Sequence, residues 1–499
     1  MLNSEAIQAL RAYIKATWKT LTRTPAQILQ AAQDPKLEQI PGHPWLVYVS
    51  PQEDLEAIKQ YIAAILTPTE FSQIELRTLP SDIGEIEEHG LLYLPLDYVV
   101  PGGRFNEMYG WDSYFIVLGL LRDQEYTLAQ NMADLFSYQI KNYGTILNGN
   151  RTYLLNRSHP PLFSRTLLRV FEYNSDINWL KSQLPTVEAY YFYWTVPPHL
   201  NQVTGLSHYN ALGHGPAPEV VNSEKDEQGL THYERVLDYY RHHEVEEYDL
   251  SLYYDREQDQ LTDLFYQGDR SMRESGFDIS NRFGPFSVDI IHYAPVCLNV
   301  LLYQMEKDIA LMHQIAEHED IAQSWLATAQ RRHELIDQFL WDEERGMYFD
   351  YNFRSDKRST YEFMTTFMPL WAGIASPKQA QGLMENLRRF EANGGLLTSN
   401  YVSGNQWDAP FGWAPLQLFV VEGLLNYGYR EEAFRIASKF IGLVIQEFEK
   451  TGTILEKYDV ARCSSEVSES IYYGYSSNEI GFGWTNGVIL ELLALFEFC

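Results

Sequence analysis

One stretch indicates the fold and the site of this chain more clearly than any other: Pro101-Gly102-Gly103-Arg104-Phe105-Asn106-Glu107-Met108-Tyr109-Gly110-Trp111-Asp112-Ser113-Tyr114. A glycine pair that lets backbone approach a ligand is followed by a cation, two carboxylates and four aromatic rings. The hydroxyls of a small polyhydroxylated ligand need charged hydrogen-bond partners, and its C–H faces pack on rings. The segment therefore favours a site for a small, sugar-like ligand.

The composition describes a large acidic chain. Its 499 residues include 38 Lys and Arg against 67 Asp and Glu, a net charge of −29 at pH 7. Such a surface repels nucleic acid and anionic membranes, so neither is expected as a partner, whereas a small neutral sugar fits. Residues 1–24 predict an amphipathic helix rather than a signal peptide, and no apolar run reaches the roughly 18–20 residues of a membrane span. With three scattered cysteines, we expect a cytoplasmic protein; its oligomeric state stays open.

Helical periodicity dominates the rest of the chain. The pattern predicts helices over 111–143, 176–196, 290–319, 321–340, 378–390, 415–427, 430–450 and 487–498, with weak strand-like alternation over 74–100. Helices joined by long aromatic loops indicate an all-α fold of helix hairpins stacked in a ring or bundle. We expect an N-terminal extension over 1–95 and one large domain over 96–499.

The segment 220–270 is rich in charge, including His242-His243-Glu244. A metal site is one interpretation of this cluster, and a solvated helical insertion or lid is the other, which we favour. The carboxylates of 255–263 lack the central glycine and closing glutamate of a calcium loop. We predict neither a metal nor a cofactor.

Three further segments combine polar groups with glycine, proline or tryptophan. Residues 148–161 carry Asn148, Arg157 and His159; residues 274–283 carry Gly276, Asp278 and Arg282; residues 406–415 carry Trp407, Asp408 and Trp413. Each also has a purely structural interpretation, such as a surface arginine, an ion pair between Asp278 and Arg282, or a helix-packing corner. Glu456, in 455–459, could belong to an exposed charged turn.

Glycoside hydrolysis is a reaction in which two of these carboxyl groups could act together. Inverting enzymes use one carboxylic acid to protonate the leaving oxygen and one carboxylate to activate water, roughly 6.5–9.5 Å apart. Asp278 and Glu456 could meet across a sugar only in the folded chain. Spacing alone does not select them over Asp112, Asp408 or Glu219.

These motifs resemble those of the trehalase family. Residues 101–114 match its first signature and 406–415 its second, and 148–161, 274–283, 456–459 and 481–488 resemble further blocks in the same order. The resemblance implies an (α/α)6 toroid in which Asp278 is the general acid and Glu456 the general base. It also implies a substrate site formed by Arg104, Phe105, Tyr109, Trp111, Asp112, Asn148, Arg157, His159, Glu219, Gly276, Arg282, Trp407, Asp408 and Trp413.

The chain departs from the family pattern mostly at positions that we expect to bind the second sugar unit, which is the leaving group of the reaction. His159 stands where family members carry Gln, Ala217 where they carry Arg, and Phe411 where Asn is common. Tyr475 or Ser476 stands nearest a substrate-binding Glu, and 220–270 contains an insertion. Because lost hydrogen-bond partners change specificity strongly, we expect an inverting α-glucosidase for glucosylglycerol or a similar small glucoside. An α,α-trehalase is the alternative, and a sugar-binding regulatory protein without activity is a third hypothesis.

Overall fold

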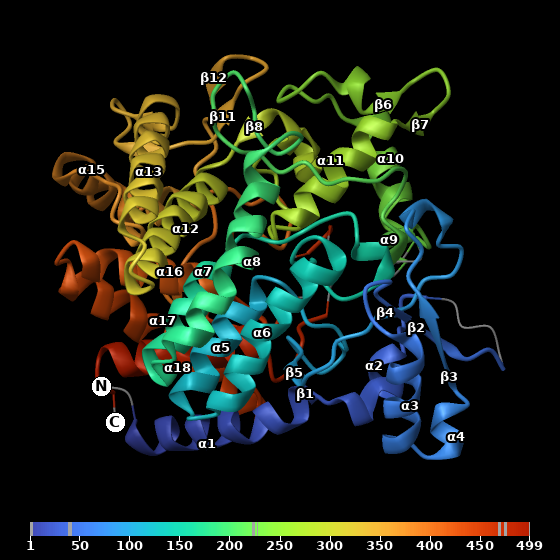
Figure 1. Cartoon of the computed structure of the whole chain (residues 1–499). Coiled ribbons are helices and arrows are strands. Elements are labelled where there is room, and N and C mark those ends of the chain that lie inside the picture. The colour runs from blue at the N-terminus through green and yellow to red at the C-terminus, as the bar shows by residue number, and fades with distance from the viewer. Residues whose placement is uncertain are drawn as a thin grey trace.

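The structure, a computed structural model of the chain, describes residues 3–37, 42–221, 225–226, 228–467, 471–473 and 477–498. It is dominated by helices gathered around a common centre, with a smaller lobe that holds a sheet at the N-terminal end (Figure 1). Among the helices of these residues, none is long and apolar enough to cross a membrane.

An inner ring of helices forms the centre of the molecule. Each helix of the ring packs on the next, and the last, α18, returns to the first, α5. Helix α5 is buried from Asp112 through Leu121 and α18 through most of its length, as expected of helices enclosed on all sides. The inner helices are α5 (Asp112–Arg122), α7 (Phe163–Asn174), α12 (Val296–Ile315), α14 (Met368–Trp371), α16 (Ala414–Asn426) and α18 (Gly483–Leu495).

An outer layer of helices surrounds this ring, and each outer helix buries only one face. The N-terminal helix belongs to this layer, because α1 packs against α17 and α18 through Leu10, Ile14 and Trp18. The arrangement is an (α/α)6 toroid, as the family resemblance implied. The outer helices are α6 (Tyr126–Tyr143), α8 (Ile177–Thr195), α13 (Glu319–Phe339), α15 (Pro377–Leu387), α17 (Arg430–Thr451) and α1 (Ser4–Leu21).

The N-terminal lobe contains a small parallel sheet. Strand β2 (Trp45–Val49) lies between β3 (Ile74–Thr78) and β4 (Leu91–Leu92), with Val47 paired to Leu76 and Leu91. Helix α3 (Leu55–Ile65) links β2 to β3, and its buried Ile58 and Ile62 join the sheet in a separate hydrophobic cluster. The short helices α2 (Ile28–Ala32) and α4 (Pro68–Phe71) complete the lobe. The division at residue 95 stays a prediction.

Short elements shape the loops at one mouth of the toroid. Strands β15 (Phe411–Trp413) and β16 (Lys457–Asp459) pair antiparallel and set Trp413 opposite Lys457. The 220–270 segment contributes α10 (His232–His242) and leads into α11 (Asp263–Glu274), after α9 (Pro218–Val221). The other strands are β1 (Thr22–Arg23), β5 (Tyr98–Val99), β6 (Tyr254–Asp255), β7 (Gln260–Leu261), β8 (Tyr293–Ala294), β9 (Trp341–Asp342), β10 (Met347–Tyr348), β11 (Tyr351–Asn352), β12 (Lys357–Arg358), β13 (Glu391–Ala392) and β14 (Gly395–Leu396).

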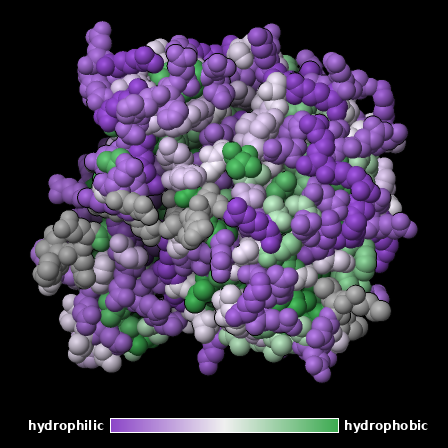
Figure 2. All heavy atoms as spheres, turned by 180° about the vertical axis from the view of Figure 1, so that it is seen from behind, coloured by the Kyte–Doolittle hydropathy of each residue, from purple (hydrophilic) through white to green (hydrophobic). Residues whose placement is uncertain are grey.

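The predicted extents of the helices over 111–143 and 290–319 were wrong; the second is the shorter α12, Val296–Ile315. The expected helix over 111–143 is two helices, because α5 ends at Arg122 and α6 begins at Tyr126. Between them Gln124 adopts a left-handed backbone conformation (φ 65°), which ends helical hydrogen bonding. The face seen in Figure 2 is mostly hydrophilic, with hydrophobic side chains in small groups, as the acidic composition leads one to expect.

Candidate active site

A cavity of about 390 Å³ opens among the loops at this mouth. Its volume suits a small ligand, and its walls combine aromatic rings with charged groups. It collects predicted residues from segments that are distant in sequence. The predicted site residues on its surface are Arg104, Phe105, Tyr109, Trp111, Asp112, Asn148, Arg157, His159, Glu219, Gly276, Asp278, Trp407, Trp413 and Glu456.

Asp278 and Glu456 differ in their surroundings. Asp278, on the loop after α11, is 35% exposed into the cavity, and the Arg273 guanidinium lies 3.7 Å from its carboxylate. Burial raises the pKa of Asp278 to about 6; the charge of Glu456 adds to the rise, and that of Arg273 opposes it. Glu456 is 2% exposed, and the Lys457 ammonium lies 3.4 Å from its carboxylate. Asp278 therefore keeps its proton to a higher pH than an ordinary aspartate, and Glu456 has a cation beside its carboxyl group.

A hydrogen-bonded chain links the two carboxyl-bearing loops. The Lys457 ammonium donates to Gln406 Oε1 (3.0 Å), and Gln406 Nε2 donates to the backbone carbonyl of Asp278. Lys457 also lies over the Trp413 ring, 5.5 Å from its centre. Gln406, which the sequence analysis did not select, thus couples the second signature to both candidate catalytic residues.

Indole rings form the apolar part of the wall. Trp407 and Trp413 stack with centres 4.0 Å apart, while Trp111 and Trp484 meet edge to face at 5.7 Å. Gly276 is required next to this cluster, because its φ is 76° and a side chain would come within 2.9 Å of the Trp111 ring. Such rings suit the C–H faces of a sugar.

Arg157 presents hydrogen-bond donors without partners. Its side chain is buried and donates from Nη2 to Glu219, but Nε and Nη1 have no acceptor among the described residues. Glu219 Oε2 is likewise buried and unpaired there. Because unpaired buried polar groups are costly, these atoms indicate a bound ligand rich in hydroxyls.

His159 is held in one orientation. Its Nδ1 accepts a hydrogen bond from the Trp111 backbone N–H (3.3 Å), which leaves the ring proton on Nε2. Burial lowers the pKa of His159 to about 3, and the charge of Arg157 acts in the same direction. The residue is therefore a neutral donor in a cavity wall where the family carries an amide.

Two members of the predicted site, Arg282 and Asp408, do not lie on the cavity. Arg282 is buried and pairs with Asp350 at 2.6 and 2.7 Å. Asp408 accepts hydrogen bonds from the Asn281 backbone, Tyr361, Ser399 and Ser403. The charged groups of both side chains have partners inside the protein, on the segments that carry Asp278 and Trp407, and their part in substrate binding stays a prediction.

The departures from the family pattern are distributed unevenly. His159 lines the cavity, whereas Phe411 is fully buried in β15 and away from it, and Ala217 is buried beside Tyr233. Tyr475 and Ser476 lie outside the described residues. From the same loop, Glu479 pairs with Arg104 at 3.2 Å.

The 220–270 segment contributes to the wall through Val220, His232 and Arg235. Arg235 donates to the Tyr472 carbonyl at 2.8 Å, which joins this segment to the 472–479 loop. Its role as a lid stays a prediction. In the described ranges, no group of three or more histidine, cysteine, aspartate or glutamate side chains is arranged to hold a metal ion.

Several wall residues escaped the sequence analysis. Arg273 directly precedes the selected segment 274–283, so a segment one residue longer would have included it. It pairs with Asp269 at 3.0 Å on one side and faces Asp278 on the other. Tyr153 lies within the selected segment 148–161 but was not named there, and Lys36 belongs to no motif, yet both line the cavity. Lys36 comes from the N-terminal extension, outside every segment selected.

Comparison with known proteins identifies similar chains. The family model described as "Trehalase" matches residues 2–497. The cytosolic neutral trehalase of Kluyveromyces lactis is 34% identical over 95% of this chain and 69% of its own length. That of Neurospora crassa is 38% identical over 78% of this chain and 57% of its own. The chain thus spans little more than half to two thirds of the length of these curated relatives.

Solved structures agree with these matches. The neutral trehalase Nth1 of Saccharomyces cerevisiae superposes with a TM-score of 0.82 at 31% identity, covering 98% of this chain and 94% of that one. A GH63 mannosylglycerate hydrolase from Thermus thermophilus gives a TM-score of 0.54 at 18% identity over 79% of this chain and 95% of that one, a likeness of fold alone.

Proposed function

This chain belongs to the trehalase family and is a glycoside hydrolase, and on that premise we propose that it hydrolyses α,α-trehalose to two glucose molecules with inversion. One observation carries the proposal: one cavity is lined both by Asp278, whose pKa burial raises to about 6, and by the buried Glu456. Inverting glycoside hydrolysis needs this pair of groups.

In the proposed reaction the Asp278 carboxylic acid donates its proton to the glycosidic oxygen. Glu456 accepts a proton from the water that attacks the anomeric carbon from the opposite side. The bond from that carbon to the glycosidic oxygen breaks as the bond to the water oxygen forms. One glucose therefore leaves as the β-anomer, and a proton exchange with water restores both carboxyl groups.

The remaining cavity residues bind and orient the sugar. The buried N–H groups of Arg157 and the free oxygen of Glu219 suit sugar hydroxyls, and the indoles of Trp407 and Trp111 suit its C–H faces. The cytosolic location in the names of the fungal relatives supports a cytoplasmic location for this chain as well.

Trehalose replaces glucosylglycerol as the first candidate substrate. The similar curated chains are trehalases by name, and the Nth1 match extends over almost the whole chain. Glucosylglycerol remains the second candidate, because His159 puts a ring donor on the cavity wall where the family carries glutamine.

A substrate panel tests the proposal. Purified protein is incubated with trehalose, glucosylglycerol and glucosylglycerate, and released glucose is measured. We expect the highest kcat/KM for trehalose, and early proton NMR spectra should show equal amounts of new β-glucose and α-glucose, because only the cleaved unit inverts. A preference for glucosylglycerol would overturn the substrate, and α-glucose alone would overturn inversion. Binding of every glucoside without turnover would favour the regulatory hypothesis.

The pH dependence should follow the Asp278 proton. A general acid works only while protonated, so kcat/KM for trehalose should fall by about tenfold per pH unit above a midpoint near pH 6. Arg273→Met removes a cation that lowers the pKa of Asp278, so this midpoint should move to higher pH. The exposed control Arg256→Met removes the same charge far from the cavity and should leave it in place. An unmoved midpoint in Arg273→Met would contradict the assignment.

A further inference from the structure

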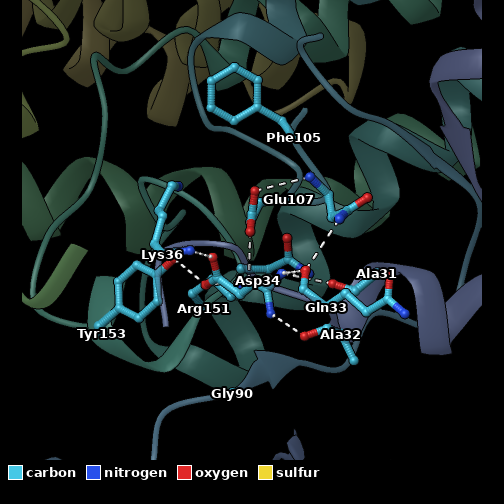
Figure 3. Close-up of polar contacts among 12 residues, drawn as sticks. Ala31, Ala32, Gln33, Asp34, Lys36, Gly90, Phe105, Glu107, Arg151 and Tyr153 are labelled. Atoms are coloured by element: carbon cyan, nitrogen blue, oxygen red, sulfur yellow. Dashed lines mark hydrogen bonds and ion pairs between the residues drawn. The ribbon is translucent and has the colours of Figure 1, made fainter. Parts of the chain in front are cut away.

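A lysine from the N-terminal extension reaches the cavity. After α2 ends at Ala32, the chain continues through Asp34 and Pro35 to Lys36, and all three line the cavity wall. None of these residues belongs to the toroid or to a family signature. Figure 3 shows Lys36 beside Tyr153, close to Asp34 and Glu107.

A buried cluster of charges fixes this turn in position. Arg151 is fully buried, donates to Glu107 (2.6 Å), and reaches the backbone carbonyls of Ala31, Ala32 and Gln33. On the other side, Asp34 accepts hydrogen bonds from the Tyr153 hydroxyl (2.7 Å) and the Lys36 backbone N–H (3.0 Å). The backbone at Lys36 is thus held by contacts that do not involve its own ammonium.

The ammonium itself faces aromatic rings of the sugar-binding segment. It donates to the Tyr109 hydroxyl at 3.1 Å and lies 5.6 Å from the centre of the Phe105 ring and 5.9 Å from that of Tyr109. Among the described residues Tyr109 is its one hydrogen-bond acceptor, whereas an ammonium has three N–H donors. Two donors remain at a wall that the cavity touches.

Charge balance alone does not explain this placement. Burial disfavours the ammonium, but Tyr109, Glu107 and Asp34 together raise the pKa of Lys36, so the group stays charged. No carboxylate oxygen of Asp34 or Glu107 lies within 4.0 Å of it in the described structure; Arg151 takes the direct contacts. A lysine kept only as a counter-ion would contact the carboxylates.

We propose that Lys36 is a substrate-binding residue, whose ammonium donates a hydrogen bond to a hydroxyl of the bound glucoside. The proposal rests on the proposed function. It makes the N-terminal extension part of the active site, because a cation next to two ring faces provides the mixture of polar and C–H contacts that a sugar needs. Lys36 is 73 residues from Tyr109 in the chain, so the two meet only when the N-terminal lobe is docked.

The test measures binding without turnover. Calorimetric titration with trehalose is carried out on Asp278→Asn and on the same chain carrying Lys36→Met. Losing a hydrogen bond from a charged donor should weaken trehalose binding by roughly 10- to 100-fold, at a melting temperature close to that of the parent. Lys59→Met changes a half-buried lysine of the same lobe that does not line the cavity; it is the matched control and should bind like the parent.

Two further variants keep the result decisive. Lys36→Arg retains the cation and should keep most of the affinity, while Lys36→Gln replaces the methionine variant if that one fails to fold. Affinity within twofold of the parent in Lys36→Met or Lys36→Gln would overturn the inference and leave the proposed function intact. Absence of trehalose binding by the parent, together with absence of turnover by the unmodified protein, would overturn the proposed function first.

Discussion

Asp278→Asn and Glu456→Gln are each expected to lower kcat for trehalose by about 10²–10⁴-fold, the share of a rate that a positioned acid or base supplies. The amide at residue 278 has no acidic proton for the leaving oxygen. The amide at residue 456 cannot take a proton from water. Initial rates of glucose release at saturating trehalose measure both effects. The exposed control Glu257→Gln should keep full activity.

A substrate that needs no acid separates the two roles. Fluoride leaves α-glucosyl fluoride with little protonation, so Asp278→Asn should hydrolyse it far faster, relative to the unmodified protein, than it hydrolyses trehalose. Glu456→Gln should stay slow on both, because water activation is needed in each case. The opposite pattern would exchange the assignments. Full activity of either variant on trehalose would remove that residue from the mechanism.

Most helices of the toroid could be predicted from local hydrophobic periodicity, but the inner helices α7 and α14 were not predicted. The expected 415–427 and 430–450 correspond to α16 and α17 within a residue at each end. The break between α5 and α6 at Gln124 was not predicted, because the sequence has neither glycine nor proline there. Strand β2 escaped although Trp45–Val49 is a short apolar run between Pro44 and Pro51, a signal that favours a buried strand.

The site was less predictable, since its members meet only through the fold. Sequence spacing did not distinguish Asp278 and Glu456 from the other candidate catalytic carboxylates; only the family resemblance selected them. The buried ion pair of Arg282 was not predicted, because its partner Asp350 lies 68 residues away and no local pattern indicates the contact. Lys36 was not predicted because its contact with Tyr109 is also distant in sequence, and no neighbouring residue indicates it.

Arg151→Met is expected to lower the free energy of unfolding by about 3–5 kcal/mol, as removal of one partner from a buried ion pair does. The variant removes the Arg151 donor from three backbone carbonyls and from the Glu107 carboxylate, which among the described residues keeps only the hydrogen bond from the Asn106 backbone N–H. Burial alone would raise the pKa of Glu107, but the charges of Arg151 and Lys36 lower it to about 2, which shows how strongly this site depends on its cations.

Denaturant unfolding at pH 7 measures the loss, with Arg77→Met as the matched control. Arg77 forms ion pairs with Glu75 and Glu88 on the same lobe, but it is 38% exposed, so its removal should cost only about 0–1 kcal/mol. Adding Glu107→Gln to Arg151→Met removes the orphaned charge, and the double variant should therefore be less destabilised than the sum of the two single changes, by about 0.5–3 kcal/mol.

Equal losses for Arg151→Met and Arg77→Met would mean that the cluster does not hold the lobe. Because Lys36 reaches the cavity from that cluster, Arg151→Met should also weaken trehalose binding under conditions in which the toroid stays folded.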